Sequence, residues 1–269
     1  KPLTGLHLKA ACLATALFAG NTASAHVSYL LPTTFNTSNG NYVTLVSSFS
    51  DKFPNAEIAV KSDDYHIIRP SGERDEYDAI SSFRQMVLLE SDLDEEGTYR
   101  FTTGLRLGRV GKYAEVDGKL QAIFVEEGEP KIPENATRVV TGQTATVADV
   151  YVSKGAPTWT AVEQSVGPLV LKPDLHPNEI YFGDELTFDV QFDGQPLPHQ
   201  TMELTRQGGE YEDPKFEQLI ETDENGQLKL SFDKPGLYLL MTRHQADAPE
   251  GADTDIRSYT TSITFEVLR

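Results

Sequence analysis

The segment ELTFDVQFDG, residues 185–194, decides the fold of this chain. Its run of β-branched and aromatic residues ends at Asp193-Gly194, a dipeptide that supplies the positive φ of a tight hairpin turn. Asp117-Gly118 and Asn225-Gly226 punctuate the chain in the same way. No segment after residue 25 keeps a helical apolar period for long. The sequence therefore predicts an all-β protein.

Short strands are expected between glycine, proline, asparagine and aspartate residues in both halves of the chain. In the first half they are predicted at residues 42–49, 57–60, 65–68, 83–89, 98–102, 113–116, 120–125 and 144–152. In the second half they are predicted at residues 185–192, 201–205, 216–221, 227–232, 237–242 and 259–267. Residues 75–82 contain few apolar side chains and are expected to form a loop. This density of short strands is typical of β-sandwiches.

A connection rich in proline and glycine, residues 154–173, separates the two halves. Such a composition favours a domain boundary, which is placed near residue 168. We therefore expect an N-terminal β-rich domain over residues 26–168 and a C-terminal domain over residues 169–269. The C-terminal domain is predicted to be an immunoglobulin-like or transthyretin-like β-sandwich.

The first 25 residues have the layout of a cleavable secretory signal peptide. Lys1 and Lys9 flank the start, an apolar run covers residues 10–20, and Ala23-Ser24-Ala25 forms the cleavage site. Cleavage would make His26 the first of 244 remaining residues, and it would remove Cys12, the only cysteine of the 269-residue precursor. No later segment approaches the roughly 20 apolar residues of a membrane span. We expect a periplasmic protein without a membrane span or a disulfide bond.

Acidity limits the classes of partner. The chain has a formal net charge of −18, which becomes −20 once Lys1 and Lys9 are removed. Nucleic acid and anionic lipid are excluded as expected partners, because binding either requires lysine and arginine to neutralise negative charge. Nucleophile elbows, zinc-protease motifs and phosphate-binding loops are absent from the sequence. We therefore expect a non-enzymatic protein, and cations are the favoured ligands.

An amino-terminal His26 would offer its α-amine and imidazole Nδ1 to one metal ion. These nitrogen donors, without thiolate, are typical of sites for nickel, cobalt, copper or zinc. Other residues must complete the coordination sphere. His244 is the first candidate because an acidic loop follows it, and His66 is the second because it lies in a predicted strand beside two aspartates. Each is weighed against an ordinary packing or solvated role, which is the expectation for the two remaining mature-chain histidines, His176 and His199.

Two acidic clusters and one tryptophan have simpler interpretations. Residues 73–78 and 92–96 lack the spacing of a calcium-binding loop, so they are expected to be solvated loops. Trp159 is expected to cover the contact between the two domains, with a sugar-stacking surface as the alternative.

Several segments together carry a family resemblance. They are Ala25-His26 and residues 29–32, 148–155, 166–173, 181–186, 193–197, 222–226, 237–244 and 257–261. In this order the chain resembles the NikM-like family of exported proteins, a domain family of unknown function associated with the periplasmic component of nickel or cobalt uptake. Turns at residues 193–197, 222–226 and 234–238 also resemble those of carboxypeptidase-regulatory-like β-sandwich modules.

The NikM-like resemblance implies two β-rich domains in the Gram-negative periplasm and a transition-metal ion bound for transport. An inner-membrane or outer-membrane metal transporter would be the partner. His176 inherits no family role, because it stands in His176-Pro177-Asn178 where many members have Asn-Pro. The alternative hypothesis is a non-enzymatic β-sandwich module of the cell envelope that recognises a glycan or a protein through its loops.

Overall fold

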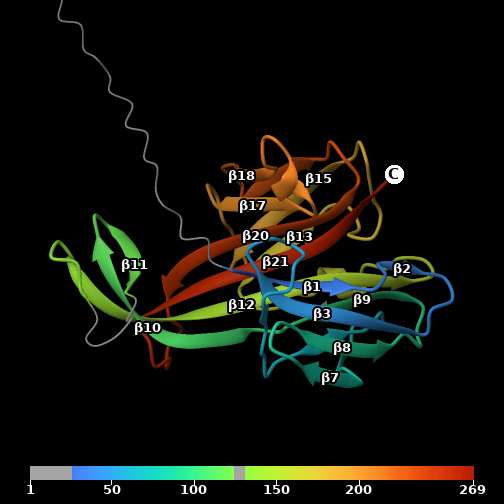
Figure 1. Ribbon diagram of the computed structural model, residues 1–269, viewed down its shortest axis with the longest axis horizontal. Helices are drawn as coiled ribbons and strands as arrows, with labels where there is room; N and C mark the ends of the chain where they lie inside the picture. The colour runs from blue at the N-terminus through green and yellow to red at the C-terminus, as the bar shows by residue number, and fades with distance from the viewer. Residues whose placement is uncertain (1–25, 124–130) are drawn as a thin grey trace, which may run out of the picture.

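The computed structural model describes residues 26–123 and 131–269 and shows an all-β protein (Figure 1). The predicted signal peptide, residues 1–25, lies outside the described residues. Helix within the described ranges is limited to α1 (Thr160–Glu163) and the 3-10 turn η1 (Gly209–Tyr211). Neither is long and apolar enough to cross a membrane. The predicted fold class is confirmed.

The strands form three sheets. The first contains β1 (Val27–Pro32), β3 (Tyr42–Ser50), β8 (Val87–Asp92) and β7 (Ala79–Ser82) in that order, with β4 (Ile58–Ala59) paired to β3. The third contains β13 (Leu169–Pro173), β15 (Glu185–Phe192) and β16 (Gln195–Pro196), with β19 (Gln227–Ser231) paired to β15. Both sheets pack against the second, larger sheet.

The second sheet extends through both halves of the chain. Its order is β18 (Glu217–Glu221), β17 (Thr201–Arg206), β20 (Gly236–Asp247), β21 (Ile256–Leu268), β12 (Arg138–Lys154), β9 (Gly97–Thr102), β5 (His66–Ile68) and β6 (Arg74–Asp75). Four further strands pair with members of this sheet. They are β10 (Arg106–Val116) and β2 (Asn36–Thr37), which pair with β12, β11 (Lys119–Ile123), which pairs with β10, and β14 (Ile180–Tyr181), which pairs with β21. The last strand, β21, lies between β20 and β12 and runs parallel to β12.

Two hydrophobic cores lie on the large sheet. The N-terminal core includes Leu45 of β3, Phe101 of β9 and Val150 of β12. The C-terminal core includes Phe188 of β15 and Phe265 of β21, so two sheets pack face to face around it as in an immunoglobulin-like sandwich. The domain boundary near residue 168 stays a prediction, because the large sheet is continuous across the two halves.

Side-chain alternation along β20 divides its residues between the two faces of the sheet. Tyr238 and Leu240 lie in the C-terminal core. Leu239 and Met241 pack on the other face, in a small cluster with Val27 and Tyr29 of β1 and with Phe53. The first strand is therefore held against the outer face of β20 by apolar contacts.

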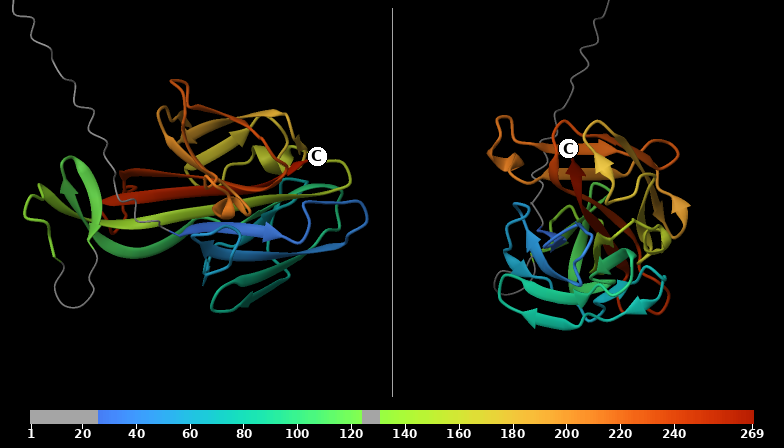
Figure 2. Two further views of the ribbon diagram at one scale, coloured as in Figure 1. Left: turned by 45° about the horizontal axis from the view of Figure 1, so that its top comes forward. Right: turned by 90° about the vertical axis from the view of Figure 1, so that its right-hand side faces the viewer.

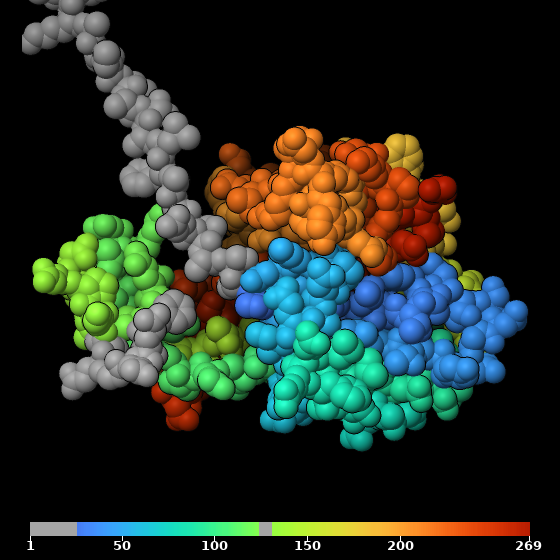
Figure 3. Space-filling view, in the orientation of Figure 1, coloured from blue at the N-terminus to red at the C-terminus, as the bar shows by residue number. Residues whose placement is uncertain are grey.

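The predicted tight turns are present. Asp117-Gly118 has φ values of 52° and 75°, and Asp193-Gly194 has values of 48° and 76°. The first of these turns joins β10 to β11 in a hairpin that projects from the rest of the molecule (Figures 2 and 3). One strand, residues 120–125, was expected after the Asp117-Gly118 turn. The observed strand β11 ends at Ile123, and residues 124 and 125 lie outside the described residues.

Several strands were not predicted from the sequence, among them the two-residue strands β2, β6, β14 and β16. Residues 75–82, expected to form a loop, contain β7 as an edge strand whose four residues are all exposed, so no buried apolar residue marks it. The strand β13 lies inside the proline- and glycine-rich connection. The strand β1 was not predicted as a strand, and the candidate site begins at the residue before it.

Candidate metal centre

The start of β1 is fixed beside the end of β3. Antiparallel pairing places Val27 opposite Ser50. His26, one residue before β1, therefore lies next to the loop of residues 51–57, which leaves β3 and returns as β4. Asp51 stands at the beginning of this loop and Glu57 at its end, so strand pairing alone brings three chemically active side chains together.

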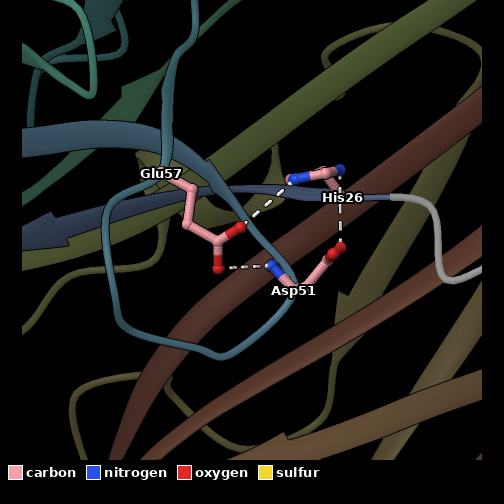
Figure 4. Close-up of side chains that lie close together, drawn as sticks. All are labelled: His26, Asp51 and Glu57. Carbon is pink, nitrogen blue, oxygen red and sulfur yellow. Dashed lines mark hydrogen bonds and ion pairs between the residues drawn. The ribbon is translucent and has the colours of Figure 1, made fainter.

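The side chains of His26, Asp51 and Glu57 point toward one another (Figure 4). The distance from His26 Nδ1 to Asp51 Oδ1 is 3.5 Å, and the distance from His26 Nε2 to Glu57 Oε2 is 3.2 Å. One ligand atom from each residue lies within 4.8 Å of the other two. The three side chains are 39%, 34% and 32% exposed, so the cluster is open to solvent.

Hydrogen bonds to the protein fix the orientation of Glu57. Its Oε1 atom accepts hydrogen bonds from the backbone N–H of Asp51 (3.1 Å) and from the hydroxyl of Ser50 (3.4 Å). Its own backbone N–H donates to Oγ of Ser48 at 3.1 Å. The remaining carboxylate oxygen, Oε2, is the one that faces His26. No hydrogen bond to the Asp51 carboxylate is found within the described part of the chain.

The loop between the two acids is anchored in the interior. Phe53 is buried and packs edge-on against Tyr29, with the ring centres 5.3 Å apart. The Tyr29 hydroxyl donates a hydrogen bond to the carbonyl oxygen of Pro54 at 2.7 Å. Burial raises the pKa of Tyr29 to about 12, although its contact with Ser48 opposes this shift. Tyr29 therefore remains a hydrogen-bond donor throughout the physiological pH range.

These donors fit a transition-metal ion. One imidazole and two carboxylates supply nitrogen and oxygen ligands, the set that proteins use for zinc, cobalt and nickel. Two ligands on opposite sides of an ion with bonds of about 2.1 Å lie roughly 4.2 Å apart. At most one pair of ligands can lie opposite each other, and tetrahedral ligands are roughly 3.4 Å apart, so the three side chains, whose ligand atoms lie within 4.8 Å of one another, must move closer together to hold one ion. No other group of three or more histidine, cysteine or acidic side chains with this spacing occurs in residues 26–123 and 131–269.

His66 lies apart from this cluster. It is in β5 and buried, and its Nδ1 atom is 2.7 Å from the carbonyl oxygen of Asp64. Burial lowers the pKa of His66, and the hydrogen bond to Asp64 opposes that effect. The side chain therefore has the contacts of a neutral packing histidine, and the structure does not bring it to His26.

His244 also lies apart from His26. In β20 it follows the alternation of Tyr238 and Leu240, so it is on the sheet face opposite to β1. Its ring packs on Phe192, with centres 4.6 Å apart. Burial lowers its pKa, against the opposing effect of Asp193. The structure places His244 with aromatic side chains rather than with His26.

The two other histidines occupy different settings. His176 is buried, with Nε2 3.0 Å from Oγ1 of Thr98 and 3.1 Å from the carbonyl oxygen of Thr158. Trp159 packs edge-on against it at 5.3 Å. Because Thr98 belongs to β9 and His176 follows β13, this contact ties the two halves of the chain together. His199 is exposed in a turn, with a φ of 55°.

The two acidic clusters converge on one arginine. Arg69 pairs with Asp75 at 2.5 Å, with Glu95 at 2.7 Å and with Asp94. Side-chain bonding to Glu95 is the largest cause that raises the pKa of Arg69, whose side chain is 17% exposed. The clusters were expected to be solvated loops, and most of their acids are exposed, but Asp75, Asp94 and Glu95 also form an ion-pair network around Arg69.

Sequence reasoning identified His26 and missed Asp51 and Glu57. Both acids flank a loop between two predicted strands, residues 42–49 and 57–60, and nothing in the sequence separates them from the other acidic residues. The available signal was the apolar run after His26. Had residues 27–32 been recognised as a strand paired to the next one, the register would have placed His26 beside Asp51.

A family model described as "Domain of unknown function (DUF4198)" matches residues 23–246. The chain belongs to this family. DUF4198 has no activity in its description, and it indicates no enzymatic class. The region that matches DUF4198 covers most of the chain and includes His26, Asp51 and Glu57. Nickel or cobalt uptake, which the NikM-like resemblance implied, stays a prediction.

Two solved structures are similar to this DUF4198 chain at low levels. The D0-D1 domain of intimin is 12% identical, covers 91% of this chain and 100% of its own, and has a TM-score of 0.23. The adhesin InvE of Yersinia pseudotuberculosis is 13% identical, with 88% of this chain and 58% of its own covered and a TM-score of 0.23. These values support no conclusion about function. No curated protein matches the chain.

Proposed function

We propose that this protein is a periplasmic, non-enzymatic protein that binds a divalent transition-metal ion through His26, Asp51 and Glu57. The observation that carries the proposal is the convergence of one imidazole and two carboxylates, each from a different part of the β1–β3–β4 region, at one open surface point. Two like-charged carboxylates held beside one histidine are electrostatically favourable for a bound cation. Nickel, cobalt, copper and zinc are the candidate ions.

The proposed export of the chain would add a further ligand. Cleavage after Ala25 would convert the backbone nitrogen of His26 into a primary amine. This amine and Nδ1 of the same residue would close a six-membered chelate ring without ordering any distant segment. The amine must lose a proton to bind, so the affinity should rise with pH through its reference pKa of about 7.7 to 8.0.

Titration calorimetry on protein that begins at His26 tests this function. We expect at least one of Ni²⁺, Co²⁺, Cu²⁺ and Zn²⁺ to bind more tightly than about 10 μM, which corresponds to roughly −6.8 kcal/mol. His26→Ala should abolish that binding, whereas His199→Ala, at an exposed histidine outside the cluster, should leave it unchanged. If no ion reaches this affinity, or if both variants behave alike, the proposal is wrong.

The bound ion would be passed to an uptake system. We propose an inner-membrane or outer-membrane metal transporter as the partner, because an open site with side chains about one third exposed allows transfer to another protein. Deletion of the chain's gene should lower cellular accumulation of the ion that binds in vitro. Re-expression of the wild-type chain should restore accumulation, and re-expression of His26→Ala should not.

One observation favours the alternative function, an interaction module of the envelope. A groove of about 570 Å³ lies where the end of β1 meets the start of β20, with Phe35, Leu237 and Glu266 among its lining residues. This volume is within the range of small-ligand pockets. Binding of an envelope glycan or protein that depends on Glu266 and is insensitive to chelator would favour this function over metal capture.

A further inference from the structure

The strand β7 forms one edge of the first sheet. It pairs with β8 on one side, and within the described residues no strand pairs with its other side, which lies at the rim of the molecule (Figure 1). All four residues of β7 are exposed, and none is charged or a proline. Charged residues, proline or a covering element normally protect such an edge from pairing with another chain. The edge strand β18, by comparison, begins and ends with glutamate.

Hydrogen bonds with β8 fix the direction of the backbone groups of β7. The N–H of Phe83 donates to the carbonyl oxygen of Met86 at the turn that joins the two strands. Antiparallel ladders alternate, so every second residue before Phe83 also faces β8. The N–H and C=O groups of Ile80 and Ser82 therefore face away from β8, and no other segment of the described chain bonds to them. These groups can pair with a further strand.

Exposed apolar side chains accompany the unpaired backbone groups. Ile80 lies opposite Leu89, which is fully buried, yet Ile80 is 51% exposed because the sheet ends beside it. Phe83, directly after the strand, is 58% exposed. A strand added at this edge would satisfy the backbone groups and cover apolar surface at the same time.

The charges on either side of β7 differ in sign. Glu76 and Asp78 come before the strand and are exposed. Arg84 follows the strand in the turn and is also exposed, and no ion pair of Arg84 is found within residues 26–123 and 131–269. The carbonyl oxygen of Arg84 accepts a hydrogen bond from the N–H of Ala59 at 3.1 Å, which holds the turn against β4. An antiparallel copy of this segment is therefore complementary to it in charge.

We propose that β7 pairs antiparallel with β7 of a second copy of this chain, with Ser81 at the two-fold axis. Ile80 of each copy then pairs with Ser82 of the other, and each of these two pairs exchanges two hydrogen bonds. The first sheets of the two copies join into one continuous sheet. A two-fold contact uses the same surface on both copies and closes after two, so the product is a dimer.

This register brings together side chains that fit in size and charge. Phe83 of one copy lies opposite Ala79 of the other, so a large exposed ring meets a small side chain. Arg84 of one copy comes to the level of Asp78 of the other, and the two-fold axis repeats this contact. A parallel copy would instead place like charges at the same level.

Sedimentation equilibrium of the chain from His26, with chelator present, tests the dimer. A contact between two edge strands is at the weak end of interface sizes, so we expect monomer and dimer to exchange over about 10 μM to 1 mM. Ser82→Pro removes the outward N–H of each copy and should weaken dimerisation by about 10-fold or more. That N–H takes no part in pairing with β8, so the fold should be retained. A monomer at every concentration would overturn the proposal.

Two matched pairs of variants test the register. Ile80→Lys should weaken the dimer, whereas Leu219→Lys, at the exposed edge strand β18, should not. Arg84→Glu should also weaken it, whereas Arg109→Glu, which makes the same change in net charge on the projecting hairpin, should not. Equal effects within either pair would overturn the register.

Hydrogen exchange locates the contact. Raising the protein concentration through the dimerisation range should protect the amides of Ile80 and Ser82. A dimer that leaves both amides unprotected would overturn the assignment to β7. Metal binding by Ser82→Pro should equal that of the wild-type chain, so the dimer and the proposed function stand or fall separately.

Discussion

A buried ion pair between β9 and β12 allows a quantitative test of the fold. Arg100 and Asp149 are each 5% exposed, and Nη2 of the arginine is 2.6 Å from Oδ2 of the aspartate. The arginine also donates to the carbonyl oxygen of Gln164, and its guanidinium carbon lies 5.6 Å from the centre of the Tyr151 ring. Asp149→Ala would leave a positive charge in this setting with one carbonyl and one ring face as partners.

The expected loss follows from the burial of the charge that remains. Breaking a buried pair by removing one partner costs about 3 to 5 kcal/mol. Replacing both partners with apolar residues of similar size is often neutral or stabilising. Arg100→Met combined with Asp149→Leu leaves the Gln164 carbonyl without its donor, which costs about 1 to 3 kcal/mol. The double variant should therefore recover part of the stability lost in Asp149→Ala.

Urea unfolding at pH 7, followed by far-ultraviolet circular dichroism, measures these differences. Asp149→Ala should reduce the free energy of unfolding by 3 kcal/mol or more, on the order of the buried-pair value. A loss below about 1 kcal/mol would mean that the pair is as weakly coupled as a surface salt bridge. A double variant less stable than Asp149→Ala would show that the pair itself, and not the uncompensated charge, dominates.

Three further outcomes are expected. Tyr29→Phe leaves the Pro54 carbonyl without its donor, so the free energy of unfolding should fall by about 1 to 2 kcal/mol and metal binding should weaken; unchanged calorimetry and unfolding would contradict this. Removal of residues 256–269 takes away β21, so the N-terminal half should lose its cooperative unfolding transition in circular dichroism. With chelator present, stability should fall as the pH decreases from about 7 to 5, because burial lowers the folded-state pKa of three histidines below the unfolded value near 6.5. The three histidines are His66, His176 and His244. A urea midpoint that does not change between pH 7 and pH 5 would refute this expectation.

The sequence predicts the elements that have both turn punctuation and an apolar face. Strands such as β3, β9 and β15 combine the two, and the Asp-Gly turns are located to the residue. The strand β7 has no buried residue, so its pairing with β8 comes from its position at the sheet edge alone. That information is tertiary, and no local pattern carries it.

The candidate site shows the same limit. His26 was identifiable because the local sequence predicts cleavage after Ala25. Asp51 and Glu57 were not, because their proximity depends on the register between β1 and β3. His244 was proposed from the acidic loop after it, and the alternation along β20 places it on the other face of the sheet. Local sequence indicates that a strand has two faces, and packing decides which one meets a given partner.

The position of the last strand has a consequence for how the molecule is made. Residues as distant as Thr141 and Asp255, 114 positions apart, meet where β12 and β21 run side by side. Until β21 has paired with it, one edge of β12 lacks its neighbour and can template aggregation. Such long-range closure makes folding slow. Chaperone capture of the nascent polypeptide would protect this edge during that interval.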